Sequence, residues 1–153
     1  MIKIMFVCHG NICRSPMAEF ILKDMVKKKG LQDKFLIRSS ATSTEEICNG
    51  IGNLVYPPAK DVLEKHKIDP TGKRAVQLKE SDYDEYDLFI GMDSANIRNM
   101  KRILGGDKNG KIHKLMEYTN ISADVFDPWY TRDFDKCYSD IYKGCEALFK
   151  SLI

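Results

Sequence analysis

A short apolar run that passes directly into a polar loop and then a helix limits the fold of this chain more than any other feature. Residues 2–7 are almost continuously apolar and include β-branched members, a pattern typical of a strand buried in a parallel sheet. After a polar loop, Ser15 is the predicted cap of a helix with Pro16 at its first position and Gly30 at its end. This order predicts the beginning of an α/β fold.

Strand and helix patterns alternate through the rest of the chain. Further strands are predicted over residues 35–39, 87–92 and 111–115, and helices over 57–65, 93–104 and 134–152. Such alternation implies a parallel sheet with right-handed crossovers and helices on both faces. We therefore expect one domain, residues 1–153, with a doubly wound fold that binds its ligand where the strands end.

Composition argues against several other classes of protein. A formal net charge of +2 is too small to predict nucleic acid or an acidic membrane as the main partner. No apolar run approaches the roughly 18 residues needed to span a bilayer, and the first residues lack the features of a signal peptide. Five cysteines without a C-x-x-C pair fit neither a disulfide framework nor a zinc site. These features predict a cytoplasmic protein with reduced thiols and no bound metal.

The loop after the first strand reads CHGNICRSP, a C-x5-R-S pattern that opens a helix. Gly10 and Asn11 stand where a tightly turning backbone needs them. Five intervening residues let the backbone curl around a tetrahedral oxyanion, so that its N–H groups and those of the helix converge on the anion. We therefore predict a phosphate-binding loop made of His9, Gly10, Asn11, Ile12, Cys13, Arg14 and Ser15.

Three side chains of this loop suit phosphoryl transfer. Arg14 offers a planar fork that can bind two phosphate oxygens together. The positive surroundings favour the thiolate form of Cys8, and Ser15 can donate a hydrogen bond to its sulfur. The pattern predicts Cys8 as a nucleophile and Arg14 as the group that binds the phosphate.

The loop and three later segments resemble the low-molecular-weight protein tyrosine phosphatases. That family's signature is close to V-C-x-G-N-I-C-R-S-P, and residues 38–43 are similar to its second strand and following loop. Residues 91–96 resemble its M-D-x-x-N segment, and residues 127–130 its D-P-aromatic-aromatic loop. The resemblance implies a four-stranded, flavodoxin-like sheet and the hydrolysis of phosphotyrosine through a phosphocysteine intermediate, with no cofactor.

The resemblance also implies roles for residues outside the loop. It makes Asp127 the general acid, with Pro128 restricting its backbone. It gives Asn11, Ser15 and Ser39 a supporting role, and it makes Trp129 and Tyr130 walls of the substrate pocket. Expected partners are proteins that contain phosphotyrosine, with inorganic phosphate or similar oxyanions as inhibitors.

One implied property concerns oxidation. Cys13 lies in the same loop as Cys8, and the matching pair of the family can form a reversible disulfide. We retain this pairing as a hypothesis, because a disulfide requires the two Cα atoms to approach within about 7 Å.

Several positions depart from the family pattern. His9 stands where an aliphatic residue is common, and Thr44 and Glu45 replace a glycine and an aromatic wall residue. The second change would remove one side of the aromatic pocket and bring negative charge near it. Residues 73–76, Lys-Arg-Ala-Val, stand in place of an H-x-A-R segment, so part of the supporting contacts is left open.

Three alternative functions compete with phosphotyrosine hydrolysis. Protein-arginine phosphatases commonly carry Thr at the position of Ile12, so Ile12 favours phosphotyrosine. Thiol-linked arsenate reductases need two further cysteines in a shuttle, and no closely spaced downstream pair stands in the expected region. Non-catalytic phosphate-binding relatives usually lose the Cys, Arg or Asp, whereas Cys8, Arg14 and Asp127 are all retained. The enzyme interpretation is therefore favoured.

Overall fold

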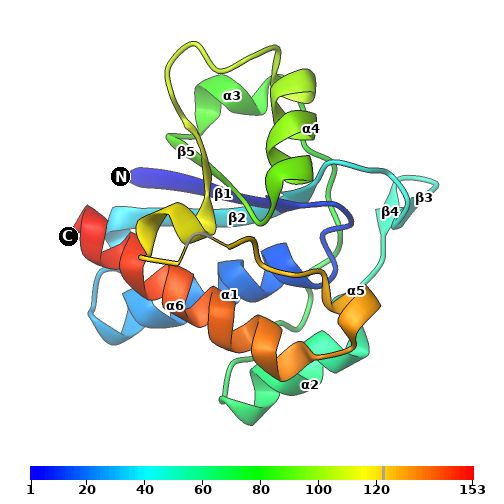
Figure 1. Cartoon of the computed structure of the whole chain (residues 1–153), viewed down its shortest axis with the longest axis vertical. Coiled ribbons are helices and arrows are strands. Elements are labelled where there is room, and N and C mark those ends of the chain that lie inside the picture. Colours follow the sequence, from blue (N-terminus) through cyan, green and yellow to red (C-terminus); the bar gives the residue numbers. More distant parts are fainter. Residues whose placement is uncertain (122) are drawn as a thin grey trace.

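A computed structural model describes residues 1–121 and 123–153 (Figure 1). Four parallel strands form one sheet in the order β2-β1-β5-β6. The strands are β1 (Ile2–Cys8), β2 (Phe35–Ala41), β5 (Leu88–Gly91) and β6 (Ile112–Lys114). Each contains or lies within a predicted strand, so the predicted four-stranded, doubly wound α/β fold is confirmed.

Helices cover both faces of the sheet (Figure 1). On one face lie α1 (Arg14–Lys28), α2 (Pro57–Lys65) and α6 (Phe134–Leu152), and on the other lie α3 (Asp82–Glu85) and α4 (Ser94–Leu104). Ile4 and Phe6 of β1 pack into the core beneath α1 and α6, whereas Met5 and Val7 pack into the core beneath α4. The central strand is apolar at successive positions because it serves two cores at once.

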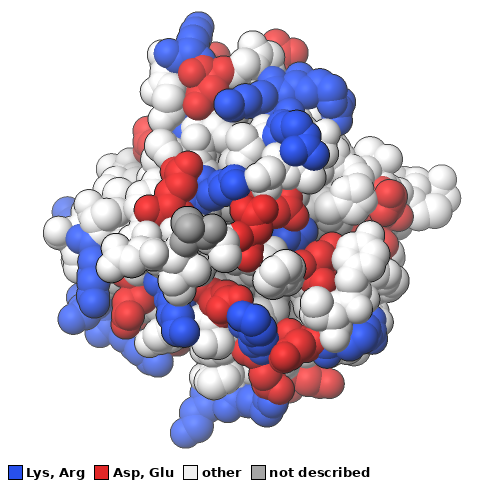
Figure 2. Space-filling view, viewed as in Figure 1, with Lys and Arg blue, Asp and Glu red and all other residues white. Residues whose placement is uncertain are grey.

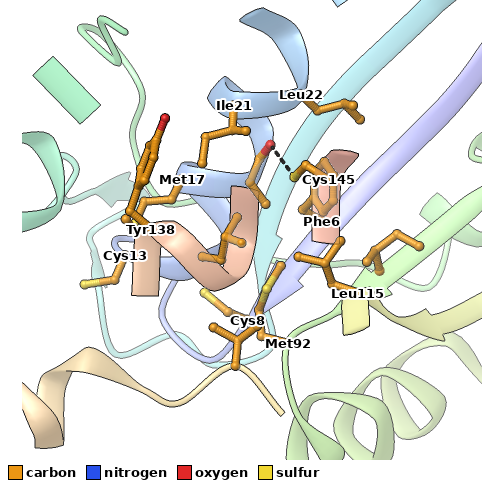
Figure 3. Close-up of a cluster of buried hydrophobic side chains, with 14 of the residues drawn as sticks. Phe6, Cys8, Cys13, Met17, Ile21, Leu22, Met92, Leu115, Tyr138 and Cys145 are labelled. Atoms are coloured by element: carbon orange, nitrogen blue, oxygen red, sulfur yellow. Dashed lines mark hydrogen bonds between the residues drawn. The ribbon is translucent and has the colours of Figure 1, made fainter. Parts of the chain in front are cut away.

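The core between α1 and α6 extends to the end of β1 (Figure 3). The predicted apolar stripe of α6 is buried from Phe134 to Leu148, and the thiol of Cys145 contacts the carbonyl oxygen of Ala18 at 3.6 Å. Cys8 belongs to this core and is 3% exposed. The nucleophile predicted from the sequence, Cys8, therefore packs against the hydrophobic core.

Several short elements were not predicted from the sequence. A two-stranded hairpin, β3 (Ile47–Cys48) and β4 (Ile51–Gly52), projects from the sheet, and α5 (Pro128–Thr131) is a single turn. Two 3-10 turns span Gln32–Lys34 and Leu115–Tyr118. Among the described residues, no helix is both long and apolar enough to cross a membrane.

The predicted cap of α1 is wrong. The helix begins at Arg14, with Cys13 at the N-cap position, so Ser15 lies inside the first turn. The helix starts before Pro16 because the phosphate loop already turns into helical backbone at Arg14. Pro16 is therefore the third residue of α1. Proline is accepted there because the first N–H groups of a helix have no partner within the helix. The hydroxyl of Ser15 instead lies 2.9 Å from the sulfur of Cys8.

Candidate active site

The phosphate loop, residues 8–15, joins the end of β1 to the start of α1 and forms the floor of a pocket of about 270 Å³. Asn11 has a φ of 59°, a left-handed backbone that asparagine tolerates better than most residues. The pocket is lined by Cys8, His9, Gly10, Asn11, Ile12, Cys13, Arg14, Glu45, Glu46, Asp127, Trp129 and Tyr130. All but one of the predicted phosphate-binding residues therefore line one pocket, and the exception, Ser15, bonds to Cys8 beneath it.

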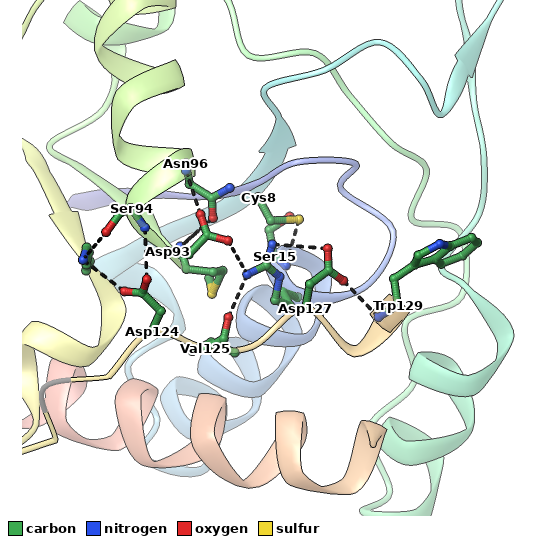
Figure 4. Close-up of polar contacts among 12 residues, drawn as sticks. Cys8, Ser15, Asp93, Ser94, Asn96, Asp124, Val125, Asp127 and Trp129 are labelled. Atoms are coloured by element: carbon green, nitrogen blue, oxygen red, sulfur yellow. Dashed lines mark hydrogen bonds and ion pairs between the residues drawn. The ribbon is translucent and has the colours of Figure 1, made fainter. Parts of the chain in front are cut away.

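Three groups of the loop direct hydrogens at the sulfur of Cys8, and Figure 4 shows Ser15, which supplies two of them, beside it. The backbone N–H groups of Asn11 and Ser15 lie 3.3 Å and 3.4 Å from it, and the Ser15 hydroxyl lies 2.9 Å from it. Hydrogen bonds donated to sulfur stabilise the thiolate more than the thiol. The loop therefore favours the nucleophilic form of Cys8.

A chain of hydrogen bonds fixes the direction of the Ser15 hydroxyl. The Asn11 side-chain amide donates to the oxygens of Ser15 at 2.8 Å and of Ser39 at 2.9 Å. Ser39 in turn donates to the carboxylate of Glu19 at 2.5 Å, and the Asn11 oxygen accepts from the N–H of Val76 at 3.0 Å. Because the Ser15 oxygen already accepts from Asn11, its own hydrogen is left for the sulfur of Cys8.

Glu19 ends this series of hydrogen bonds, and its role was not predicted from the sequence. It lies one turn after Ser15 on α1, is 3% exposed, and pairs with the amines of Lys23 at 2.5 Å and Lys73 at 3.9 Å. Burial lowers the pKa of Lys73, whose amine also donates to the carbonyl oxygen of Ser39 at 3.0 Å. A carboxylate on the buried face of α1 was the signal that could have identified it.

The residues that replace the H-x-A-R segment take part in these contacts. Lys73 contributes a cation beside Glu19, and Val76 contributes its backbone N–H to Asn11. The supporting contacts left open by the sequence are therefore present in this chain, built from a lysine and a backbone group.

The Arg14 side chain is almost completely buried, and hydrogen bonds to neighbouring residues fix its position. One terminal nitrogen donates to Asp93 and to the carbonyl oxygen of Val125, both at 2.8 Å, and the other lies 3.7 Å from Asp127. Burial opposes the guanidinium charge, but the neighbouring Cys8 and the hydrogen bond to Asp93 outweigh it and raise the pKa of Arg14. Arg14 therefore stays charged beside the pocket.

Asp93 is the second residue whose role at the site was not predicted from the sequence. It caps α4 by accepting the N–H of Asn96 at 2.8 Å, and the Asn96 side chain accepts the N–H of Asp93 at 3.2 Å. This reciprocal cap fixes the carboxylate that binds Arg14 (Figure 4). The M-D-x-x-N segment was the signal, because its Asp and Asn are the two partners of the cap.

Asp127 is more than a hundred residues from Cys8 in sequence but lines the same pocket. It caps α5 by accepting the N–H of Trp129 at 3.0 Å, and its second oxygen faces Arg14. Val125 anchors the preceding backbone by donating its N–H to the carbonyl oxygen of Met92 at 3.0 Å. The structure thus brings Cys8, Arg14 and Asp127 together at one pocket.

The rim of the pocket is exposed and carries both aromatic and charged groups. Trp129 is 51% exposed and Tyr130 is 83% exposed, and both line the pocket. Opposite them, the imidazole of His9 lies 3.0 Å from the carboxylate of Glu45. Figure 2 shows acidic side chains on the face between the hairpin and α5. The predicted negative charge near the pocket is present.

The remaining thiols differ in their surroundings from Cys8. All five cysteines are free in the structure. Burial, followed by the nearby Cys8 and Asp127, raises the pKa of Cys13, and burial raises the pKa of Cys137 to about 12. The predicted disulfide between Cys8 and Cys13 stays a prediction. Among the described residues, no cluster of three or more His, Cys, Asp or Glu side chains is arranged to hold a metal ion.

Comparison with known proteins gives consistent matches over the whole chain. The family model described as low molecular weight phosphotyrosine protein phosphatase matches residues 3–153. A low molecular weight protein-tyrosine-phosphatase of Bacillus subtilis, YfkJ, is 38% identical over 154 residues, which cover 99% of this chain and 96% of that protein. The Staphylococcus aureus protein PtpA is 35% identical over 157 residues, which cover 100% of this chain and 95% of that protein.

Solved structures agree with these relatives. The crystal structure of YfkJ superposes with a TM-score of 0.93 over 99% of this chain and 94% of that one. The low molecular weight protein tyrosine phosphatase of Streptococcus pyogenes superposes with a TM-score of 0.86 at 38% identity, over 100% of this chain and 94% of that one. Sequence and fold therefore point to the same set of proteins.

Proposed function

This chain belongs to the low molecular weight phosphotyrosine protein phosphatases, and from that premise we propose that Cys8, Arg14 and Asp127 carry out its reaction. The protein is a phosphatase that hydrolyses phosphotyrosine through a phosphocysteine intermediate. One observation carries the assignment of residues. The sulfur that accepts three hydrogen bonds lies in the same pocket as a buried guanidinium and a carboxylate.

The first step transfers the phosphoryl group to the enzyme. The thiolate of Cys8 attacks phosphorus in line, a sulfur–phosphorus bond forms, and the bond to the tyrosine oxygen breaks. Arg14 and the N–H groups of the loop bind the equatorial oxygens, whose charge they offset most strongly in the transition state. Asp127, in its acid form, donates its proton to the departing oxygen, so that tyrosine leaves as a neutral phenol.

The second step releases the phosphate. Asp127, now a carboxylate, takes a proton from water as the water oxygen attacks phosphorus. The sulfur–phosphorus bond breaks, and Cys8 leaves as a thiolate that the Ser15 hydroxyl stabilises through the 2.9 Å contact. Inorganic phosphate departs, and Asp127 has regained the proton it gave away.

The substrate class follows from the same site. The family acts on phosphoproteins, and we assign phosphotyrosine as the target residue, with inorganic phosphate or similar oxyanions as inhibitors. The exposed rings of Trp129 and Tyr130 support this assignment because they offer flat surfaces for an aromatic side chain. A cytosolic location is also part of the proposal, supported by five free cysteines.

Phosphate release from matched peptides tests the proposed function. Phosphotyrosine, phosphoserine and phosphoarginine peptides of one sequence are incubated without metal, with the wild type and with Cys8→Ser. We expect release from phosphotyrosine alone, and we expect Cys8→Ser to abolish it while phosphate still binds. Because Cys8 is buried, circular dichroism of both proteins checks that the variant is folded.

Two results would contradict the proposal. Faster release from phosphoarginine would keep the chemistry but overturn the substrate argument from Ile12. Retention of activity by a folded Cys8→Ser variant would remove Cys8 from the mechanism.

A further inference from the structure

Arg132 follows the single helical turn after Asp127, and its guanidinium lies against three aromatic rings. Arg132 has a φ of 59° and donates its backbone N–H to the carbonyl oxygen of Pro128 at 2.8 Å. The central carbon of its guanidinium lies 5.5 Å from the ring of Tyr56, 5.8 Å from that of Trp129 and 5.5 Å from that of Phe134. These three rings are called the aromatic cluster below.

The rings are the main partners of this charge. Among the described residues Arg132 forms no ion pair with a carboxylate, and its side-chain hydrogen bond goes to the Tyr56 hydroxyl at 3.1 Å. The rings also contact one another, with centroids 5.0 Å apart for Tyr56 and Trp129 and 5.9 Å apart for Tyr56 and Phe134. A guanidinium over several ring faces is attracted to each of them.

Tyr56 connects the aromatic cluster to the floor of the pocket. Its backbone N–H donates to the carbonyl oxygen of Ile12 in the phosphate loop at 2.9 Å. On the other side, the ring of Trp129 packs against that of Tyr56 at a tilt of 50°, and the backbone N–H of Trp129 donates to Asp127 at 3.0 Å. A continuous path of contacts therefore runs from the phosphate loop through the cluster to the carboxylate.

The segment that carries Asp127, residues 125–132, is thus attached at both ends. On the N-terminal side of Asp127, Val125 is hydrogen-bonded to Arg14 and to Met92. On the C-terminal side, Arg132 contacts the aromatic cluster. Between these points the Asp127 side chain is 31% exposed and its nearest charged partner, Arg14, is 3.7 Å away. Beside the ring contact between Trp129 and Tyr56, Arg132 is the residue that joins the end of this segment to the aromatic cluster.

We propose that Arg132 is a positioning residue that holds Asp127, through the aromatic cluster, where it can protonate the departing phenol. This inference rests on the proposed role of Asp127 as general acid. A general acid matters most when the leaving group is basic, as tyrosine is with a pKa of about 10. A leaving group that departs easily as an anion needs no proton, so it reports whether the rest of the site is intact.

The test uses Arg132→Gly and two substrates with different leaving groups. Glycine suits the left-handed backbone at this position, so the turn is retained while the side chain is removed. The substrates are phenyl phosphate and a dinitrophenyl phosphate, compared by kcat/KM, which includes the steps up to phosphocysteine formation. We expect a loss of about tenfold with phenyl phosphate, a part of the roughly 10²–10⁴-fold that a positioned acid supplies, and almost none with the dinitrophenyl ester.

Lys67→Gly is the matched control. Lys67 is also an exposed cation with a left-handed backbone, φ 62°, but it lies just after α2 and makes no cation–π contact among the described residues. Its replacement should change kcat/KM for neither substrate. An equal loss in Lys67→Gly and Arg132→Gly would overturn the proposal, because a general backbone effect would then explain both.

Asp127→Asn, measured in parallel, separates the two proposals. If Asp127→Asn itself slows both esters equally, the general-acid assignment fails. If Asp127→Asn is selective for phenyl phosphate but Arg132→Gly is not, the assignment stands and the role of Arg132 falls. In the Asp127→Asn background Arg132→Gly should cause no further loss, since the two changes remove one function.

Discussion

The floor and the rim of the pocket are built in opposite ways. The floor, Cys8 and residues 11–15, is buried, and its side chains are hydrogen-bonded to one another, to Asp93 and to Ser39, which in turn donates to Glu19. The rim, formed by His9 and Glu45 on one side and by Trp129 and Tyr130 on the other, is largely exposed. A phosphate group is the same in every substrate, whereas the surrounding peptide varies. A fixed floor and an adaptable rim suit that difference.

The largest expected effect lies on the floor. Arg14→Lys keeps the charge but loses the planar fork that binds two phosphate oxygens and reaches Asp93 and Val125 together. We expect kcat to fall about 10³-fold, as for loss of a preorganised transition-state donor, and by the same factor for every phosphotyrosine peptide. Steady-state kinetics on two unrelated peptides provide the measurement. A loss of kcat that differs strongly between the two peptides would contradict the assignment of Arg14 to the part of the pocket that is common to all substrates.

The second effect separates two thiols of the floor. Cys13 has a raised pKa, mainly from burial, so it stays protonated at neutral pH and becomes a thiolate only in alkaline solution. Cys8 accepts three hydrogen bonds that favour its thiolate. We expect iodoacetate at pH 6 to alkylate Cys8 more than about a hundredfold faster than Cys13, since the thiolate is the reactive form. Peptide mass spectrometry over time measures both rates.

The control for this experiment is Cys8→Ser, in which Cys13 should remain unmodified at pH 6. The rate at Cys13 should rise only as the solution is made alkaline. Comparable alkylation of both thiols at pH 6 would contradict the difference that the structure indicates.

A third effect lies beneath the floor. Glu19→Gln replaces the carboxylate that accepts the Ser39 hydrogen by a neutral amide, so Ser39, and with it the Asn11 side chain that donates to Ser15, is held less firmly. We expect kcat to fall about tenfold and the stability to fall by about 1–3 kcal/mol, because Lys23 and Lys73 lose their shared carboxylate. Alkylation of Cys8 at fixed pH should slow in parallel.

Glu64→Gln is the matched change at an exposed carboxylate, which pairs with Lys60 at 3.7 Å. It should alter neither the activity nor the melting temperature by a measurable amount. If Glu19→Gln lowers the melting temperature but leaves Cys8 alkylation unchanged, Glu19 contributes only to stability.

The smallest effect is expected at the rim. Glu45→Gln removes an exposed charge that pairs with His9, so the change in kcat/KM should be about twofold. Its sign should depend on the peptide: substrates with basic residues next to phosphotyrosine lose, and acidic ones gain. Raising the salt concentration should remove the difference. The same change in kcat/KM for every peptide would show that Glu45 acts on the phosphate group, as the floor does, and not on the surrounding peptide.

The main strands and the phosphate loop were predictable because their signals are local. β1 is apolar at successive positions, and the loop has its cysteine and arginine within one short stretch. The hairpin was missed because each of its strands has only two residues, although Asn49 and Gly50 at its turn are a known hairpin signal.

The supporting residues were harder to predict because their partners are distant in sequence. Asp93 is 79 residues from Arg14, and Val76 is 65 residues from Asn11. Nothing near Lys73 in the chain indicates that it will lie beside Glu19, and only the resemblance to a family drew attention to that segment. Packing of the sheet and its helices creates these neighbours, so local patterns cannot reveal them.

The distance between Cys8 and Asp127 along the chain has a consequence for synthesis. A growing chain presents its thiol loop long before Asp127 exists, and at roughly 5–20 residues per second the interval lasts about 6–24 seconds. During that interval α6, which packs against α1, is also missing. The nascent protein therefore carries a cysteine loop that is not yet an active site, and its catalytic activity begins only when the final helix packs against the first.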